Sequence, residues 1–155
     1  MKKFLQKKLK DQKGMTLIEL LAVIVIIAII AAIAIPAIGN IIENSRVGAI
    51  KADASNVLNA ANLYELDENV PATAGTVLVS ELVSEGYLDD AGEIPTAGSV
   101  LLASNTLTAT ATNGGLSVAF DGADNSAVNT MPNNQEGEYT PASGDGVGKI
   151  TVTRN

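Results

Sequence analysis

The chain has 155 residues, which is long enough for one domain with a buried core, and its net charge is −7. It contains no cysteine and no histidine, which excludes disulfides, cysteine nucleophiles, histidine acid–base chemistry and the usual zinc ligands. Its acidic balance also lacks the charge that neutralises phosphates, so no direct nucleic-acid partner is expected. We therefore expect a protein that is not an enzyme and that uses no cofactor.

Charge and hydropathy change abruptly near the N-terminus. Residues 1–14 form a basic leader with six lysines and one aspartate, whereas residues 15–155 hold four basic and sixteen acidic side chains. Residues 15–38 are apolar except for Thr16 and Glu19, and as a helix of ~36 Å they cross the ~30 Å hydrocarbon layer of a bilayer. The lysines place the leader in the cytoplasm and the rest of the chain outside it.

Residues 39–66 predict an amphipathic continuation of the membrane helix, because apolar residues recur there at helical spacing. No strong stop separates the two segments. One helix from about Met15 to Leu66 is therefore expected, ended by the acidic sequence LDEN and by Pro71. The apolar stripe of this second half consists of Ile50, Ala54, Val57, Leu58, Ala61 and Tyr64.

Residues 67–155 predict a globular head, which gives an α+β fold in which the long helix packs against a small antiparallel sheet. A short helix comes first, with Val79, Leu82 and Val83 on its apolar face and Gly86 as its C-cap.

The period then changes to two, which is typical of strands. Apolar residues alternate with threonines over residues 106–112, a turn follows at 113–115, and residues 116–120 alternate again, so a hairpin is predicted. Residues 149–153 predict a further strand. Residues 121–148 are rich in Gly, Asn and Pro and predict a loop.

The segment KGMTLIELLAVIVIIAIIAAIAIP closely resembles the N-terminus of type IV pilins and pseudopilins. The matching features are the basic leader, Gly14, Glu19 four residues beyond Met15, Pro36 and the unbroken apolar run. The resemblance implies cleavage between Gly14 and Met15 by a membrane prepilin peptidase and N-methylation of the new Met15 amine. Two departures are Met15, where many members have Phe, and the lack of the cysteine pair that often staples the C-terminal loop, here within residues 121–155.

The resemblance implies a structural pilin of a type IV pilus-like surface filament, polymerised with copies of itself or with minor pilins through its apolar helix. An inner-membrane platform protein and an assembly ATPase would serve it. Before assembly it would be a single-pass cytoplasmic-membrane protein. The alternatives are a pseudopilin of a type II secretion or DNA-uptake machine, and an uncleaved, monomeric membrane-anchored binding module. Adhesion, motility, DNA uptake and secretion all stay open as roles.

Three residues are candidates for assembly. Glu19 is either a solvated acid at the membrane interface or the partner of a neighbouring subunit's Met15 amine, a pair that offsets the cost of burying both charges and sets the register. Pro36 and Gly39 either bend the helix or mark a segment, residues 31–39, that loses helix inside a filament.

An oxygen-rich loop holds the weak metal candidates Asp121, Asp124 and Asn125. Calcium binds such oxygens, but the spacing does not match an EF-hand loop. An Asx-type turn is the expected alternative, so no metal site is predicted.

Overall fold

The computed structural model describes residues 16–67 and 75–154. The chain divides into two compact units, residues 1–40 and residues 41–155. The long helix α2 (Leu17–Asp67) contributes to both units, and its bounds agree with the single helix that the sequence predicts.

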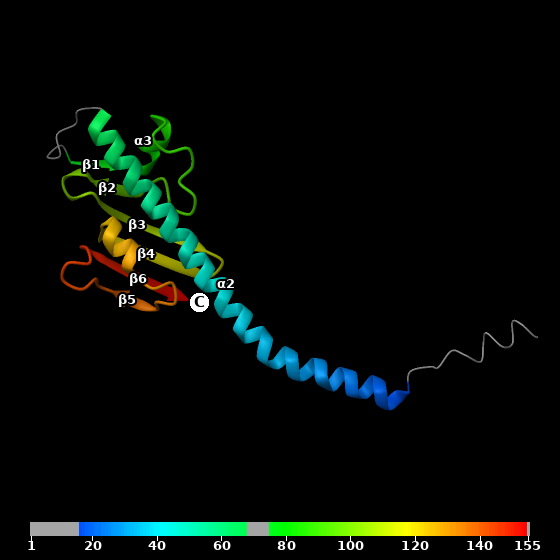
Figure 1. Cartoon of the computed structure of the whole chain (residues 1–155). Coiled ribbons are helices and arrows are strands. Elements are labelled where there is room, and N and C mark those ends of the chain that lie inside the picture. The colour runs from blue at the N-terminus through cyan, green and yellow to red at the C-terminus, as the bar shows by residue number, and fades with distance from the viewer. Residues whose placement is uncertain (1–15, 68–74, 155) are drawn as a thin grey trace, which may run out of the picture. The chain divides into compact units, whose positions relative to one another are not determined.

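The second unit is an α+β fold in which the latter half of α2 packs on a six-stranded antiparallel sheet (Figure 1). Short helices and connections interrupt the strands along the chain. The elements after α2 are β1 (Thr76–Leu78), α3 (Val79–Ser84), β2 (Ser99–Leu101), the 3-10 helix η1 (Leu102–Ser104), β3 (Thr106–Asn113), β4 (Leu116–Ala123), α4 (Asn125–Thr130), β5 (Gly137–Tyr139) and β6 (Lys149–Arg154).

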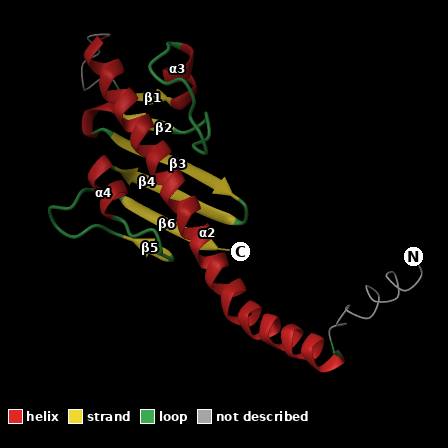
Figure 2. Cartoon of the chain, turned by 45° about the vertical axis from the view of Figure 1, so that its right-hand side comes forward, coloured by secondary structure: helices red, strands yellow, loops and turns green. Residues whose placement is uncertain are grey.

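The strand order is β1-β2-β3-β4-β6-β5, so the last strand of the chain lies between β4 and β5 (Figure 2). The predicted hairpin is confirmed as β3 and β4, whose register pairs Asn113 with Leu116. The two residues between them, Gly114 and Gly115, both have positive φ, which the tight hairpin turn requires. The predicted C-terminal strand is confirmed as β6, which pairs with β4 along its whole length.

The core lies between α2 and the sheet face that it covers. The predicted stripe of α2 is buried from Ile50 to Ala61, and Tyr64 is half-buried at its end. On the sheet, alternate residues of the central strands point into this core, as period-two alternation predicts. They are Leu107, Ala109 and Ala111 on β3, Leu116, Val118 and Phe120 on β4, and Ile150 and Val152 on β6.

The predicted short helix is confirmed as α3, which buries Val79 and Leu82 while Val83 packs at the edge of the core. Gly86 follows it with a φ of +82°, and its N–H donates to the carbonyl of Val83. Only glycine adopts this left-handed conformation freely, so Gly86 ends the helix as predicted.

The prediction of a loop over residues 121–148 is wrong. This stretch contains the end of β4, the helix α4 and the edge strand β5. Helix α4 buries only Ala127 and Val128, too few apolar residues to show a helical period. Strand β5 is defined by backbone pairing with β6 and has no buried side chain, so alternation could not reveal it.

Candidate processing and assembly site

The N-terminal end of α2 is closed by a reciprocal pair of hydrogen bonds between Thr16 and Glu19. The Thr16 backbone N–H donates to Glu19 Oε2 over 2.7 Å, and the Glu19 backbone N–H donates to Thr16 Oγ1 over 3.3 Å. The Thr16 hydroxyl also donates to Glu19 Oε2 over 2.8 Å. This is a capping box, in which a Thr at the N-cap and a Glu three residues later satisfy donors that the first helical turn leaves unpaired.

The capping box adds a third interpretation of Glu19 to the two from the sequence. Its signature, Thr-x-x-Glu ahead of an apolar run, was readable in the sequence but was missed there. Both side-chain bonds end on Oε2, so Oε1 has no hydrogen bond within residues 16–67 and 75–154. A carboxylate has acceptor sites on both oxygens, so the cap leaves Glu19 able to accept from a second partner. The cleavage residues Gly14 and Met15 lie outside the described residues.

Beyond the cap, α2 presents apolar side chains to solvent around its whole circumference. Residues 17–40 are all exposed except Ala31 and Ala34, which are half-buried. This is the one helix in the described part of the chain that is long and apolar enough to span a membrane, with a mean hydropathy of 3.2 over its best window. A helix that is apolar on every side needs lipid or other apolar helices around it. The segment therefore indicates membrane anchoring.

Helix α2 continues through Pro36 and Gly39 without interruption. Pro36 has no N–H, so one helical hydrogen bond is missing one turn earlier. A Cβ added at Gly39 would meet no other atom within 4 Å, so packing within the chain does not require glycine there. Both features weaken the helix locally, and both interpretations, a bend or a segment that melts in a filament, stay predictions.

The weak calcium candidates are used in local structure. Asp124 is the N-cap of α4, because its Oδ1 accepts from the Ala127 N–H over 2.7 Å. Asn125 donates through its side-chain amide to Asn59 Oδ1 on α2, and Asp121 is exposed on β4. Within the described ranges, no group of three or more metal-ligating side chains lies together.

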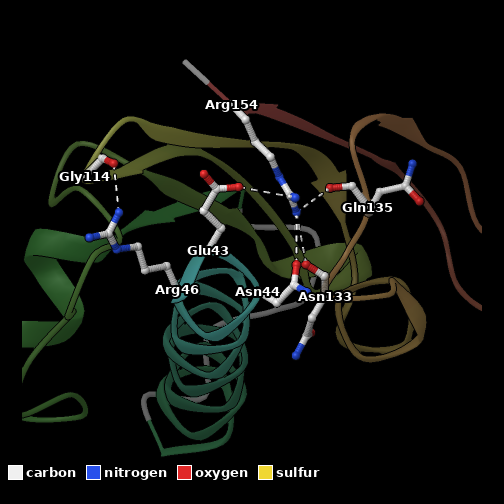
Figure 3. A network of polar contacts seen from close by, with 7 residues as sticks. All are labelled: Glu43, Asn44, Arg46, Gly114, Asn133, Gln135 and Arg154. Atoms are coloured by element: carbon white, nitrogen blue, oxygen red, sulfur yellow. Dashed lines mark hydrogen bonds and ion pairs between the residues drawn. The ribbon is translucent and has the colours of Figure 1, made fainter. Parts of the chain in front are cut away.

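Two cationic side chains, Arg154 and Lys51, link the C-terminal region to α2 through hydrogen bonds and an ion pair. Arg154, at the end of β6, forms an ion pair with Glu43 on α2 at 3.5 Å (Figure 3). Its Nη2 also donates to the side chain of Asn44 over 3.4 Å and to the carbonyls of Asn133 and Gln135 over 3.3 and 3.2 Å. One guanidinium thus joins the last strand, the loop before β5 and the long helix.

The second cation is Lys51 on α2, which caps the end of α4. Its ammonium donates to the carbonyls of Asn129 and Met131 and to Asn133 Oδ1. Carbonyls at a helix end attract a cation, because they are unpaired and carry partial negative charge. Burial nevertheless lowers the pKa of Lys51 below its ordinary value. Neither set of contacts was predictable from a local pattern, because Lys51 and its partners are at least 78 residues apart, and Arg154 and Asn44 are 110 residues apart.

The comparison with known protein families identifies the N-terminal segment. Residues 9–35 match the family model described as the prokaryotic N-terminal methylation motif. No curated protein and no solved structure matches the chain significantly. The match spans the last six residues of the basic leader, the capping box and most of the exposed apolar helix, so it supports the resemblance seen in the sequence. The chain therefore carries, at its N-terminus, the hallmark motif of type IV prepilin-like proteins.

Proposed function

We propose that this protein is a structural pilin, processed between Gly14 and Met15 and polymerised through α2 into a type IV pilus-like surface filament. The observation that carries the proposal is the helix that starts at Leu17, three residues beyond Gly14, and whose first half is apolar on every side. The methylation motif covers residues 9–35, which include Gly14 and most of this apolar segment, and it implies a prepilin peptidase. A platform protein and an assembly ATPase would then move subunits from the membrane into the filament.

The exposed apolar surface explains why such a chain would polymerise. In the membrane, lipid covers the side chains of residues 17–40. Outside it, water would contact all of them, at a cost of roughly 25 cal/mol for each Å² of apolar surface. Packing against the same segment of other copies removes this surface from water. The helix is thus compatible with two environments, a bilayer and a bundle of its own copies.

Glu19 has a defined part in this proposal. Cleavage gives Met15 a free amine, and an incoming Glu19 that meets the amine of a docked subunit would form an ion pair away from water. The cap occupies Oε2 only, which leaves Oε1 to accept from that amine. Pairing offsets the cost of burying each charge alone, so wrong registers would be penalised.

Two substitutions at Glu19 separate the charge from the cap. Glu19→Gln keeps a side-chain oxygen for the capping box, since Gln also serves at this position. It removes the negative charge, and breaking a buried ion pair costs about 3–5 kcal/mol. We expect both Glu19→Gln and Glu19→Ala to reduce sheared surface filaments strongly, measured by quantitative immunoblotting, while cleavage at Gly14 continues.

The matched control is Glu136→Gln, which removes one exposed acid from the head and should leave the filament yield unchanged. Filaments at the normal yield from Glu19→Gln, with few from Glu19→Ala, would reduce Glu19 to a helix cap. Normal filaments from both variants would remove Glu19 from assembly altogether.

A further inference from the structure

A groove lies on the head beside the C-terminal end of α2. One hollow, with a volume of about 470 Å³, is lined by Leu63 and Asn59 on α2 and by Tyr87, Asp89 and Asp90 beyond α3. A second hollow of about 360 Å³ shares Leu63 and Tyr87 with it. Its remaining lining residues are Leu66 and Asp67. We call the two together the acidic groove, defined by Leu63, Leu66, Asp67, Tyr87, Asp89 and Asp90.

The acidic groove is lined by exposed apolar side chains and by carboxylates. Leu63 and Leu66 are 56% and 77% exposed and lie outside the apolar stripe that α2 packs against the sheet. Asp67, Asp89 and Asp90 form no ion pair within residues 16–67 and 75–154. A partner that fits this groove would bring an apolar side chain and a positive charge close together.

The start of the second unit offers such a combination on the same helix. Ile41 and Ile42 are 66% and 47% exposed, and Arg46 lies one turn beyond Ile42 on the same face. Arg46 donates to the carbonyl of Gly114 over 2.9 Å and has no acidic partner in the described part of the chain (Figure 3). Its guanidinium has further donors for a carboxylate.

The other cations beyond Met15 are already engaged. Lys149 and Arg154 form ion pairs with Glu138 and Glu43, and Lys51 is surrounded by carbonyl and amide oxygens. Arg46 is thus the cation best placed to compensate an acid of another molecule. This matters because sixteen acidic side chains face only four basic ones after Met15, so copies of the head repel one another unless a contact brings such a charge to an acidic surface.

We infer that the acidic groove receives the Ile42–Arg46 turn of a second copy of this chain, with Ile42 on Leu63 and Leu66 and with Arg46 among the groove carboxylates Asp67, Asp89 and Asp90. The inference rests on the proposed function and deepens it, because it adds a head contact to the packing of the apolar helices. The two surfaces differ, so the contact is heterologous and leaves one free surface of each kind on every pair. Such a contact propagates into a filament instead of closing into a dimer.

The contact also fixes an offset between the copies. Ile42 and Leu63 are 21 residues apart on one helix, which is ~32 Å at the helical rise. Two copies with parallel helices would therefore be displaced by about 32 Å along the helix axis.

The chain has no cysteine, so introduced cysteines report the contact without background. The variant Ile42→Cys with Leu63→Cys is expressed in the native cell, and surface filaments are sheared, mildly oxidised and separated without reductant. Because each copy contributes both residues to different neighbours, we expect a ladder of disulfide-linked multimers. Each single variant has one thiol, can therefore form a dimer at most, and should stay monomeric. The matched control, Ile42→Cys with Leu101→Cys, pairs the same turn with an exposed leucine on strand β2 and should stay monomeric.

A second test uses charge and keeps the apolar residues intact. Arg46→Asp and Asp89→Arg each place like charges in the contact, and each should lower filament yield about tenfold or more. The double variant restores opposite charges and should recover most of the yield. Asp89 is exposed, so its replacement should leave the head folded.

The outcomes separate the contact from the proposed function. Filaments that give no ladder from residues 42 and 63, together with a double charge variant no better than the single ones, would overturn the inference and leave the pilin proposal intact. A wild-type chain that is never cleaved and forms no filaments would overturn both. A disulfide-linked dimer from a single-cysteine variant would indicate a symmetric contact, in which the same residue of two copies meets, and would also overturn the inference.

Discussion

The two halves of α2 have the same secondary structure but differ in how they bury their apolar side chains. Residues 17–40 are exposed on every side, whereas residues 41–67 bury one stripe against the sheet and expose the rest. Both halves are α-helical throughout. The difference lies in the partner that each half needs, since the second half finds its apolar partner within the chain and the first must find lipid or other copies.

The largest expected effect comes from truncating the buried half. Ile50→Ala removes a fully buried side chain from the core and should lower the free energy of unfolding of the head by about 2–5 kcal/mol. Its counterpart in the exposed half, Ile27→Ala, should change that free energy by less than about 0.5 kcal/mol. All three tyrosines lie beyond residue 63, so denaturant unfolding of the detergent-solubilised chain, followed by tyrosine fluorescence, reports on the head alone. Equal effects at the two positions would contradict the division of α2.

An added charge should have the opposite pattern, with a large effect in the first half of α2 and a small effect in the second. Ile27→Lys places a cation near the middle of the apolar half, where it costs about 2.5–3.5 kcal/mol in membrane insertion. Ala49→Lys adds the same charge at an exposed position of the second half and should be tolerated. The measurement is the fraction of each variant that resists carbonate extraction from membranes. Full membrane retention of Ile27→Lys would show that residues 17–40 do not form the anchor.

A smaller effect is expected where the second half of α2 holds the C-terminal region. Lys51→Met removes the ammonium from the end of α4 and leaves the carbonyls of Asn129 and Met131 without this donor, which should cost about 1–2 kcal/mol of stability. The control is Lys149→Met, which breaks an exposed ion pair and should cost less than about 1 kcal/mol. Equal costs would argue that Lys51 does not fasten this region.

The lowered pKa of Lys51 also predicts how the free energy of unfolding depends on pH, and Lys51→Met tests this dependence. Because burial lowers its pKa in the folded chain, the unfolded chain binds more protons between that value and 10.5, so the free energy of unfolding rises with pH across this window. This rise should be absent from Lys51→Met. Parallel pH profiles of the two proteins from pH 7 upward would contradict the assignment.

Regular periodicity made much of the fold predictable. The stripe on α2 repeats at helical spacing, and the hairpin of β3 and β4 combines alternation with a glycine pair in its turn. Strands β1, β2 and β5 have three residues each, too short for a pattern to emerge, and they are held by backbone pairing with their neighbours. Helix α4 depends on one capping aspartate and two buried side chains.

The candidate site was predictable in its chemistry and less so in its geometry. The position of Glu19 ahead of an apolar run indicated a functional acid. The nearby lysines and the membrane segment suggested charge pairing, and the hydrogen-bonded cap with Thr16 was not predicted. The fastening of Arg154 to Glu43 could not be predicted, because these residues are brought together only when β6 inserts between β4 and β5.

The most direct test of the central claim is mass spectrometry of filaments sheared from the native cell surface. We predict an abundant N-terminal peptide that begins at Met15 and carries one methyl group on its amine. The contradicting result is a chain that is missing from the sheared fraction and retains residues 1–14 in the membrane fraction, because an uncleaved anchor cannot place a free Met15 amine beside Glu19 of a neighbour.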